Sequence, residues 1–335
     1  MEHRELGRHG GMKVSPLGMG CWAIGGPWSL LREGEPRPAG WGKVDDAESI
    51  RTIHAAIDAG ITFFDTAANY GCGHSERILG KAVKNCRGKV VIATKFGHII
   101  NEVTKIVRGD EDAICANLRH DCESSLRRLG TETIDLYQLH AGSLEPDKAP
   151  PIREILEELV KEGKIRAYGW STDHLDRAQA FADGESCASI QFSLSAINNN
   201  ADMVELCAKH DLACINKKPL ASGILTGKFT PESTFPEDDM RRAFNFLPQF
   251  SEMLKMAEEL RDLLTSGGRT MAQGALAWIW ARSDRSIPIP GARNEKQARE
   301  NAAAMSFGPL TPSQYEEVND LVGQMRGEFE NRAEA

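Results

Sequence analysis

Four side chains able to exchange a proton or a charge follow three apolar segments of the sequence. Asp65, Lys95 and His140 each end an apolar run, and Tyr70 follows Asp65 by five residues. Apolar runs of this length are typical of buried parallel strands, and the carboxyl ends of such strands meet at one edge of the sheet. We therefore expect Asp65, Tyr70, Lys95 and His140 to face one opening.

These four residue types together suit chemistry on a carbonyl group. A tyrosine has a reference pKa of about 10, so it needs a neighbouring cation to donate a proton at neutral pH. Lys95 can be that cation and lower the pKa of Tyr70, while Asp65 holds Lys95 in place. His140 can donate a hydrogen bond to the carbonyl oxygen. No side chain supplies a hydride, so we expect a reduced nicotinamide to complete the site.

Each residue also has a structural interpretation. Asp65 and Lys95 can form a buried ion pair without catalytic use, Tyr70 can be a packed aromatic residue and His140 a hydrogen-bonded histidine at a strand end. The occurrence of all four in one pattern favours catalysis.

Strand-like and helix-like segments alternate along the chain and imply the elements that hold these residues. The predicted strands are 17–20, 62–65, 90–95, 134–139, 165–170, 188–192, 213–217 and 287–289, and the predicted helices are 46–59, 74–84, 110–129, 150–162, 175–182, 201–210, 270–282 and 294–304. Eight such units predict an α/β fold, a closed (β/α)8 or TIM barrel, with reactive groups at the carboxyl ends of its strands.

Other segments add to this barrel. Residues 4–14 predict an N-terminal β-hairpin that turns at Gly10 and Gly11. Residues 248–264 and 311–324 predict two accessory helices. With no internal repeat or low-complexity linker, we expect a single domain over residues 1–335. Three stretches are predicted to be long loops able to carry substrate specificity, namely 23–44, 97–109 and 218–247.

Composition excludes several partners. The formal charge of the 335 residues is −8 and the pI is about 5.7, so we expect no nucleic-acid or anionic membrane partner. The charged N-terminus does not resemble a signal peptide, and no apolar stretch is long enough to span a membrane. The eight cysteines show no Cys-x-x-Cys spacing and predict free thiols. We expect a soluble, cytoplasmic protein with a small-molecule partner and no metal site, while its oligomeric state stays open.

Two glycine-rich stretches mimic nucleotide-binding motifs. Gly18-x-Gly20-x-x-Ala23 fits the start of a dinucleotide fingerprint, but the Gly-Gly-Pro that follows forbids the required helix. Gly223-x-x-x-Gly227-Lys228 is one residue short of a P-loop. Neither stretch therefore predicts a Rossmann-type dinucleotide site or a nucleoside triphosphate site.

Five ordered segments resemble the aldo-keto reductase family. They are Phe64-Asp65-Thr-Ala-x-x-Tyr70-Gly, Ala93-Thr-Lys95-Phe-Gly, Asp135-Leu-Tyr-Gln-Leu-His140, Pro219-Leu-Ala-Ser-Gly-Ile-Leu-Thr-Gly-Lys228 and Ile289-Pro-Gly-Ala-Arg-Asn-x-x-Gln297-x-x-x-Asn301. The resemblance implies a TIM barrel that reduces an aldehyde or ketone to an alcohol with NADPH. It assigns Tyr70 as proton donor, Lys95 and Asp65 as its activating pair, and His140 as the residue that orients the carbonyl.

The resemblance also implies a set of cofactor contacts. Near the nicotinamide it places Asp65, Ser171 and Gln191. Thr172 stands where the family usually has asparagine, and Lys217 stands where an aromatic residue often stacks on the nicotinamide. Trp22 can take over that stacking. For the pyrophosphate it implies Leu220, Ser222, Gly223, Leu225 and Lys228, and for the adenosine end Gly291, Arg293, Gln297, Glu300 and Asn301. Arg293 carries a guanidinium suited to the 2′-phosphate that distinguishes NADPH from NADH. We expect NADPH, with NADH as an alternative cofactor.

Three other functions remain open. The same site can run in reverse as an NAD(P)-dependent dehydrogenase of a sugar or polyol. A lyase that forms a Schiff base on Lys95 is a second alternative, although the neighbouring Asp65 keeps a lysine charged and argues against it. The third is a cofactor-sensing regulatory subunit, like the potassium-channel β subunits that share the family's fold.

Overall fold

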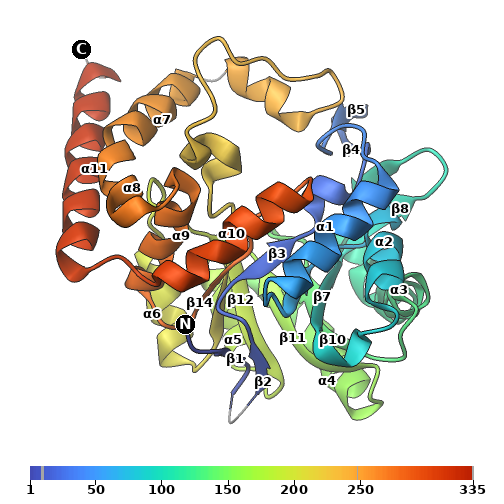
Figure 1. The fold of residues 1–335 in the computed structure, drawn as a ribbon. Coiled ribbons are helices and arrows are strands. Elements are labelled where there is room, and N and C mark those ends of the chain that lie inside the picture. Colours follow the sequence, from blue (N-terminus) through green and yellow to red (C-terminus); the bar gives the residue numbers. More distant parts are fainter. Residues whose placement is uncertain (9–10, 247, 334–335) are drawn as a thin grey trace.

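The predicted barrel is present in the computed structural model, which describes residues 1–8, 11–246 and 248–333 (Figure 1). Its eight parallel strands pair in chain order from one edge of the sheet to the other. They are β3 (Gly18–Gly20), β6 (Phe63–Asp65), β7 (Val91–Phe96), β10 (Ile134–Leu139), β11 (Ile165–Ser171), β12 (Cys187–Ser193), β13 (Ala213–Lys217) and β14 (Ser286–Pro288). The sheet closes where the Gly20 amide donates to the Pro290 carbonyl at 3.0 Å. This closure brings the first and last β/α units together, so all strand ends share one rim.

Helices surround the barrel in the expected order. They are α1 (Asp46–Asp58), α2 (His74–Val83), α3 (Ile114–Leu129), α4 (Ala149–Lys161), α5 (Leu175–Ala182), α6 (Ala201–Lys209), α9 (Met271–Arg282) and α10 (Glu295–Phe307). Asp45 caps the first of them by accepting a bond from the Glu48 amide. Thr270 and Gln273 form a capping box at the start of α9. These caps explain why both helix starts were predictable from the sequence.

The barrel buries two separate apolar clusters. Strand residues alternate between them, because successive side chains point to opposite faces. Phe63 and Leu136 belong to the cluster inside the barrel, whereas Phe64 and Tyr137 pack outward under the helices. Each such fully buried side chain contributes roughly 1.5–3 kcal/mol to stability.

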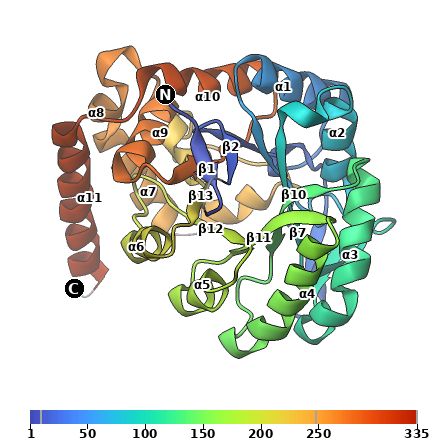
Figure 2. The same ribbon diagram turned by 90° about the horizontal axis from the view of Figure 1, so that it is seen from below.

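The N-terminal hairpin is confirmed as β1 (Arg4–Leu6) paired with β2 (Met12–Val14). Its predicted turn residue Gly10 lies outside the described residues. Seen from below, the hairpin lies across the end of the barrel opposite the reactive strand ends (Figure 2). Its Leu6, Met12 and Val14 belong to the inner apolar cluster. The hairpin therefore closes that end of the barrel.

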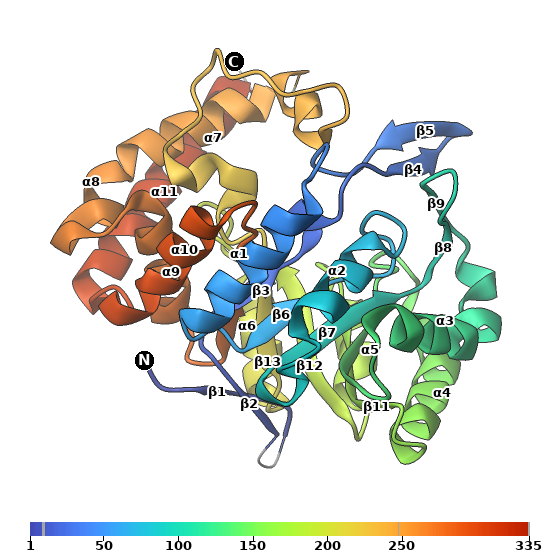
Figure 3. The same cartoon turned by 45° about the vertical axis from the view of Figure 1, so that its right-hand side comes forward.

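Two of the three predicted loops are not loops along their whole length. Segments 23–44 and 97–109 pair into a second, four-stranded sheet in the order β5 (Glu35–Pro38), β4 (Ser29–Arg32), β9 (Ile106–Gly109) and β8 (His98–Asn101). This sheet projects beyond the barrel (Figure 3). Two prolines in β5 made a strand look improbable, but β5 is an edge strand, where proline is tolerated. The pairing of β4 with β9 joins segments far apart in sequence, which local pattern does not reveal.

Some helix bounds also differ from the predictions. The helix predicted for 110–129 begins at Ile114, because Asp110 is extended and a 3-10 turn, Glu111–Ala113, precedes it. The accessory segment 248–264 is divided at Leu260 into α7 (Pro248–Glu259) and α8 (Arg261–Thr265), and the last helix, α11 (Pro312–Ala333), runs longer than expected. Among the described residues no helix is both long and apolar enough to cross a membrane.

Candidate active site

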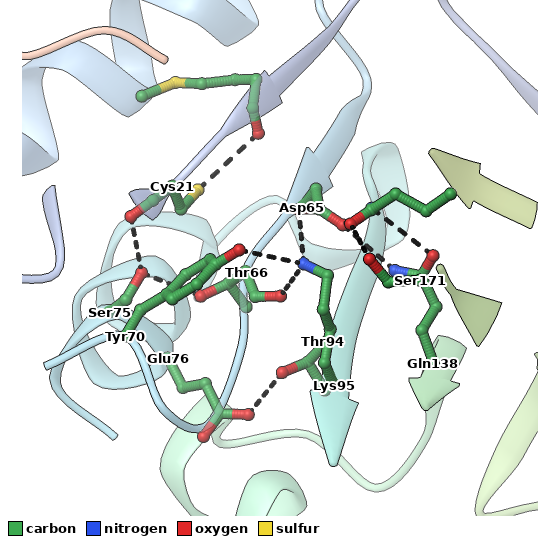
Figure 4. A network of polar contacts seen from close by, with 12 residues as sticks. Cys21, Asp65, Thr66, Tyr70, Ser75, Glu76, Thr94, Lys95, Gln138 and Ser171 are labelled. Atoms are coloured by element: carbon green, nitrogen blue, oxygen red, sulfur yellow. Dashed lines mark hydrogen bonds and ion pairs between the residues drawn. The ribbon is translucent and has the colours of Figure 1, made fainter. Parts of the chain in front are cut away.

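Lys95 lies at the centre of the predicted site (Figure 4). Its ammonium donates to Asp65 Oδ2 at 2.6 Å and to the Thr66 carbonyl at 2.8 Å, and it lies 3.5 Å from the Tyr70 hydroxyl. Lys95 and Asp65 are only 1% and 2% exposed. Neighbouring strands β7 and β6 bring the two charges to one point, as the sequence pattern predicted.

The second oxygen of Asp65 is also bound. Gln138 and Gln191 donate to Oδ1 at 3.1 and 2.8 Å. Gln138 was missed at the sequence level, although its signal was available, since it stands two residues before His140 and so shares its face of the strand. These donors fix the carboxylate and, through it, the ammonium of Lys95.

Tyr70 is packed between the barrel and the four-stranded sheet. Its ring stacks on Trp22, with centroids 5.8 Å apart and planes 13° apart, and it shares an apolar cluster with Trp28 and Val107 of the loops. The loop that carries it is tied down because Thr66 Oγ1 donates to Ser75 Oγ, which donates to the Cys21 carbonyl. The predicted long loops therefore build one wall of the site.

The lowered pKa predicted for Tyr70 is wrong. Burial raises the pKa of Tyr70 well above its usual value, and the nearby Asp65 and Cys21 raise it further. Burial is the main cause, and Lys95 does not offset it because its charge is already paired with Asp65, so the phenol faces an ion pair rather than a lone cation. Burial likewise lowers the pKa of Lys95, while the contact with Asp65 raises it.

His140 completes the group of four. Its ring meets Tyr70 edge-on, with centroids 5.9 Å apart and planes 81° apart. Burial, and then the charge of Lys95, hold the pKa of His140 well below its usual value. The imidazole is therefore neutral at neutral pH, a state in which one ring nitrogen donates and the other accepts.

Three of the residues predicted near the nicotinamide, Ser171, Gln191 and Lys217, lie on β11, β12 and β13, and Thr172 directly follows β11. Ser171 Oγ donates to Gln191 Oε1 at 3.0 Å. Thr172 is directed elsewhere, because its hydroxyl donates to the Gly142 carbonyl at 2.8 Å. Lys217 is paired with Asp173 at 3.2 Å, a partner that the sequence pattern did not predict.

The residues predicted for the pyrophosphate all lie in the segment that follows β13. Ser222 and Gly223 have φ angles of 57° and 103°, which give the turn after β13 an irregular backbone. Leu225 is buried in the main core, so only its backbone can face a ligand. Leu220 is partly buried against that core, and Lys228 pairs with Glu300 of α10 at 3.9 Å.

The remaining candidates lie just before α10 and in its first two turns. Gln297 accepts the Arg293 amide at 2.8 Å, and Asn301 donates to the Gly291 carbonyl at 3.3 Å. The Arg293 guanidinium donates to the carbonyls of Trp41 and Lys43 at 3.0 and 2.6 Å. Arg293 thus lies just after the last barrel strand, as predicted, but already has backbone partners.

The third long loop packs on the first. The Met240 amide donates to the Gly40 carbonyl at 2.9 Å, and Arg241, paired with Asp239, lies over the Trp41 ring at 4.2 Å. These contacts link the segment after β13 to the segment before α1. The sequence offered no signal for them, because they join segments that are distant along the chain.

Comparison with known proteins agrees with this arrangement. The model of the Aldo/keto reductase family matches residues 16–322. The chain is 30% identical over 305 residues to the NADH-specific methylglyoxal reductase of Escherichia coli (strain K12), covering 88% of this chain and 90% of that protein.

Solved structures show the same fold. The glycerol dehydrogenase AKR11B4 from Gluconobacter oxydans has a TM-score of 0.79 at 31% identity, covering 97% of this chain and 96% of that one. An aldo-keto reductase from Klebsiella pneumoniae in complex with NADPH has a TM-score of 0.68 at 26% identity, covering 95% of each chain. The chain therefore belongs to the aldo/keto reductase family and is an NAD(P)H-dependent oxidoreductase.

Proposed function

We propose that this chain reduces a small aldehyde or ketone to an alcohol with NADPH, using Tyr70 as the proton donor. The main support for this proposal is the position of Lys95, because its buried ammonium contacts both Asp65 and the Tyr70 hydroxyl. His140 is the residue that binds and orients the carbonyl oxygen. An ion pair that served only stability would have no need of a phenol hydroxyl beside its ammonium.

The proton balance follows from these contacts. When bound, the cofactor supplies a hydride to the carbonyl carbon. The carbonyl oxygen takes a proton from Tyr70, and the phenolate left behind is stabilised by Lys95 until solvent returns the proton. The raised pKa of Tyr70 does not oppose this transfer, since an alkoxide is a far stronger base than a phenolate. It keeps Tyr70 protonated and ready to donate.

Two groups of residues suit the cofactor. The buried Ser171–Gln191 pair offers donors and acceptors to a carboxamide, and Arg293 offers its guanidinium to a 2′-phosphate once the carbonyls of Trp41 and Lys43 release it. The Klebsiella pneumoniae relative in complex with NADPH supports this choice. The NADH-specific relative from Escherichia coli keeps NADH as an alternative.

The same residues also serve the reverse reaction. Oxidation of an alcohol needs Tyr70 as its phenolate, a form that the raised pKa of the phenol disfavours and the nearby Lys95 ammonium favours. The glycerol dehydrogenase AKR11B4 is nevertheless similar over nearly the whole chain. A polyol dehydrogenase is therefore the second candidate. The tight Lys95–Asp65 pair disfavours the Schiff-base lyase, because a charged amine is not a nucleophile. A cofactor-sensing subunit would bind NADPH without sustained turnover.

The test combines turnover with cofactor binding. A panel of aldehydes, ketones and polyols is assayed with NADPH, NADH and their oxidised forms, and Tyr70→Phe is compared with the wild type. We expect Tyr70→Phe to bind NADPH normally, by fluorescence titration, but to lose at least about 10²–10⁴-fold in kcat. Near wild-type turnover in this variant would reject Tyr70 as the acid, and a wild type that turns over no substrate would favour the sensor.

A further inference from the structure

His98 is a second histidine at the site that the proposed chemistry does not use. It begins β8, three residues after Lys95, and its ring meets the His140 ring edge-on, with centroids 5.3 Å apart and planes 84° apart. Tyr70 also contacts the ring of His140. The three rings form a chain of contacts with the proposed proton donor at one end and His98 at the other.

His98 carries unused hydrogen-bonding capacity. Its Nδ1 is buried without a partner. Its Nε2 also has no hydrogen-bond partner among the described residues but is not among the buried atoms, and His98 as a whole is half-buried, so Nε2 is the nitrogen that a ligand can reach. Burial lowers the pKa of His98 to about 4, so the ring is neutral at neutral pH, with one donor and one acceptor. Leaving a buried polar group unpaired costs about 1–3 kcal/mol. A phenylalanine would fill this place at no such cost.

The position of His98 restricts what it can bind. If His140 holds the carbonyl oxygen, a ring in direct contact with His140 reaches the atoms attached to the neighbouring carbon. A neutral imidazole serves a hydroxyl or a second carbonyl at that carbon, since it can donate or accept. A substrate carboxylate fits less well, because it would need a free positive charge. The two lysines whose charges lower the pKa of His140 are Lys95 and Lys217, and each is already paired with an aspartate.

We propose that His98 determines specificity by binding an oxygen on the carbon next to the reacting carbonyl. The preferred substrates are then neutral α-hydroxy or α-oxo aldehydes and ketones. This inference rests on the proposed function, because it takes the carbonyl to lie at His140.

A matched pair of ketones tests the assignment. Hydroxyacetone and butanone have the same number of heavy atoms and differ in a terminal hydroxyl against a methyl group. We measure kcat/KM for both with NADPH, in the wild type, His98→Phe and His98→Gln. We expect the wild type to prefer hydroxyacetone by roughly five- to fiftyfold, as a lost or unpaired buried hydrogen bond predicts. In His98→Phe this ratio falls towards one, and in His98→Gln, which keeps a donor and an acceptor, much of it remains.

The outcomes separate this inference from the proposed function. If the wild type reduces both ketones equally well, or if His98→Phe keeps the wild-type ratio, His98 does not bind the second oxygen. The proposed carbonyl reduction is not contradicted by that result. If the wild type reduces no carbonyl compound, the proposed function fails and this inference with it. Thermal unfolding and NADPH titration of each variant check that the fold and the cofactor site are intact, and a variant that unfolds is replaced by His98→Asn in the same assay.

Discussion

The ammonium of Lys95 and the carboxylate of Asp65 form an ion pair 2.6 Å long, and both side chains are almost completely removed from water. Desolvation of two charges is expensive, so such a pair persists only where further hydrogen bonds complete it. Gln138 and Gln191 supply these bonds to Asp65, and the Thr66 carbonyl accepts one from Lys95. The protein's own hydrogen bonds therefore hold the site in place.

Breaking this pair should cost stability as well as activity. Asp65→Asn leaves a buried lysine without its counter-charge, and we expect the free energy of unfolding to fall by about 3–5 kcal/mol. Lys95→Met removes the cation that stabilises the phenolate, and we expect an activity loss similar to that of Tyr70→Phe. Urea unfolding and steady-state kinetics measure the two effects.

The double variant provides the control. Asp65→Asn with Lys95→Met removes both charges, so it should lose less stability than the sum of the single variants. Strict additivity would show that the two charges do not depend on each other. Full activity of Lys95→Met would refute the coupling of Lys95 to Tyr70.

The barrel and the placement of the catalytic candidates were predictable because both follow from local pattern. Apolar runs that end in Asp65, Lys95 and His140 specify parallel strands, and parallel strands share a rim. Features that depend on distant pairing were not predictable. The sheet of β4, β5, β8 and β9 is one, and the bonds of Arg293 to the carbonyls of Trp41 and Lys43 are another.

The pKa of Tyr70 shows a further limit of the sequence. A lysine near a tyrosine suggested a more acidic phenol, but the sign depends on burial and on whether the lysine charge is free. Both are properties of the packed site. Burial of the phenol beside an already paired Lys95 reverses the expected direction.

Acid should destabilise the protein in part through His98. Its pKa is about 4 in the folded chain, against about 6.5 when unfolded, so between these values the unfolded state binds a proton that the native state does not. Stability from this group is therefore complete above pH ~6.5 and is lost as the pH falls, by about 2 kcal/mol at pH 5. We expect His98→Gln to show a smaller decrease in unfolding free energy between pH 7 and pH 5. Equal decreases in both proteins would contradict the burial of a neutral imidazole.

Cofactor choice should depend on Arg293. A charge-assisted bond to a 2′-phosphate contributes roughly 1.5–3 kcal/mol, so Arg293→Ala should weaken NADPH binding by about tenfold to a hundredfold and change NADH binding much less. Because Arg293 also bonds to Trp41 and Lys43, a disturbed loop would weaken both cofactors together. The ratio of the two dissociation constants, by fluorescence titration, is therefore the decisive measurement.

Arg299 offers a matched control for this experiment. It lies on helix α10, which follows Arg293, and approaches Glu295 only at 4.0 Å, with its side chain 54% exposed. Arg299→Ala should leave both dissociation constants unchanged. If Arg293→Ala raises both constants equally, Arg293 is not the residue that binds the phosphate.

The glycine after Tyr70 should be essential to the position of the phenol. Gly71 has a φ of +61°, and a Cβ atom there would lie 1.8 Å from the Gly25 carbonyl oxygen, too close for any real contact. Gly130, at the end of α3, has a nearly equal φ of +65°, but a Cβ atom there would have nothing within 4 Å. Alanine at either site costs about 1–2 kcal/mol for the left-handed backbone. Only Gly71→Ala must also displace the loop that carries Tyr70.

Comparing Gly71→Ala with Gly130→Ala therefore separates backbone strain from misplacement of the proton donor. We expect Gly130→Ala to lower the free energy of unfolding by about 1–2 kcal/mol and to keep its kcat. Gly71→Ala should be less stable still and should lose roughly a hundredfold in kcat, the typical effect of moving a reacting group by about 1 Å. If both variants keep the wild-type kcat, the close approach of Gly71 to Gly25 does not position Tyr70, and its side-chain contacts, such as the stacking on Trp22, suffice to hold the phenol.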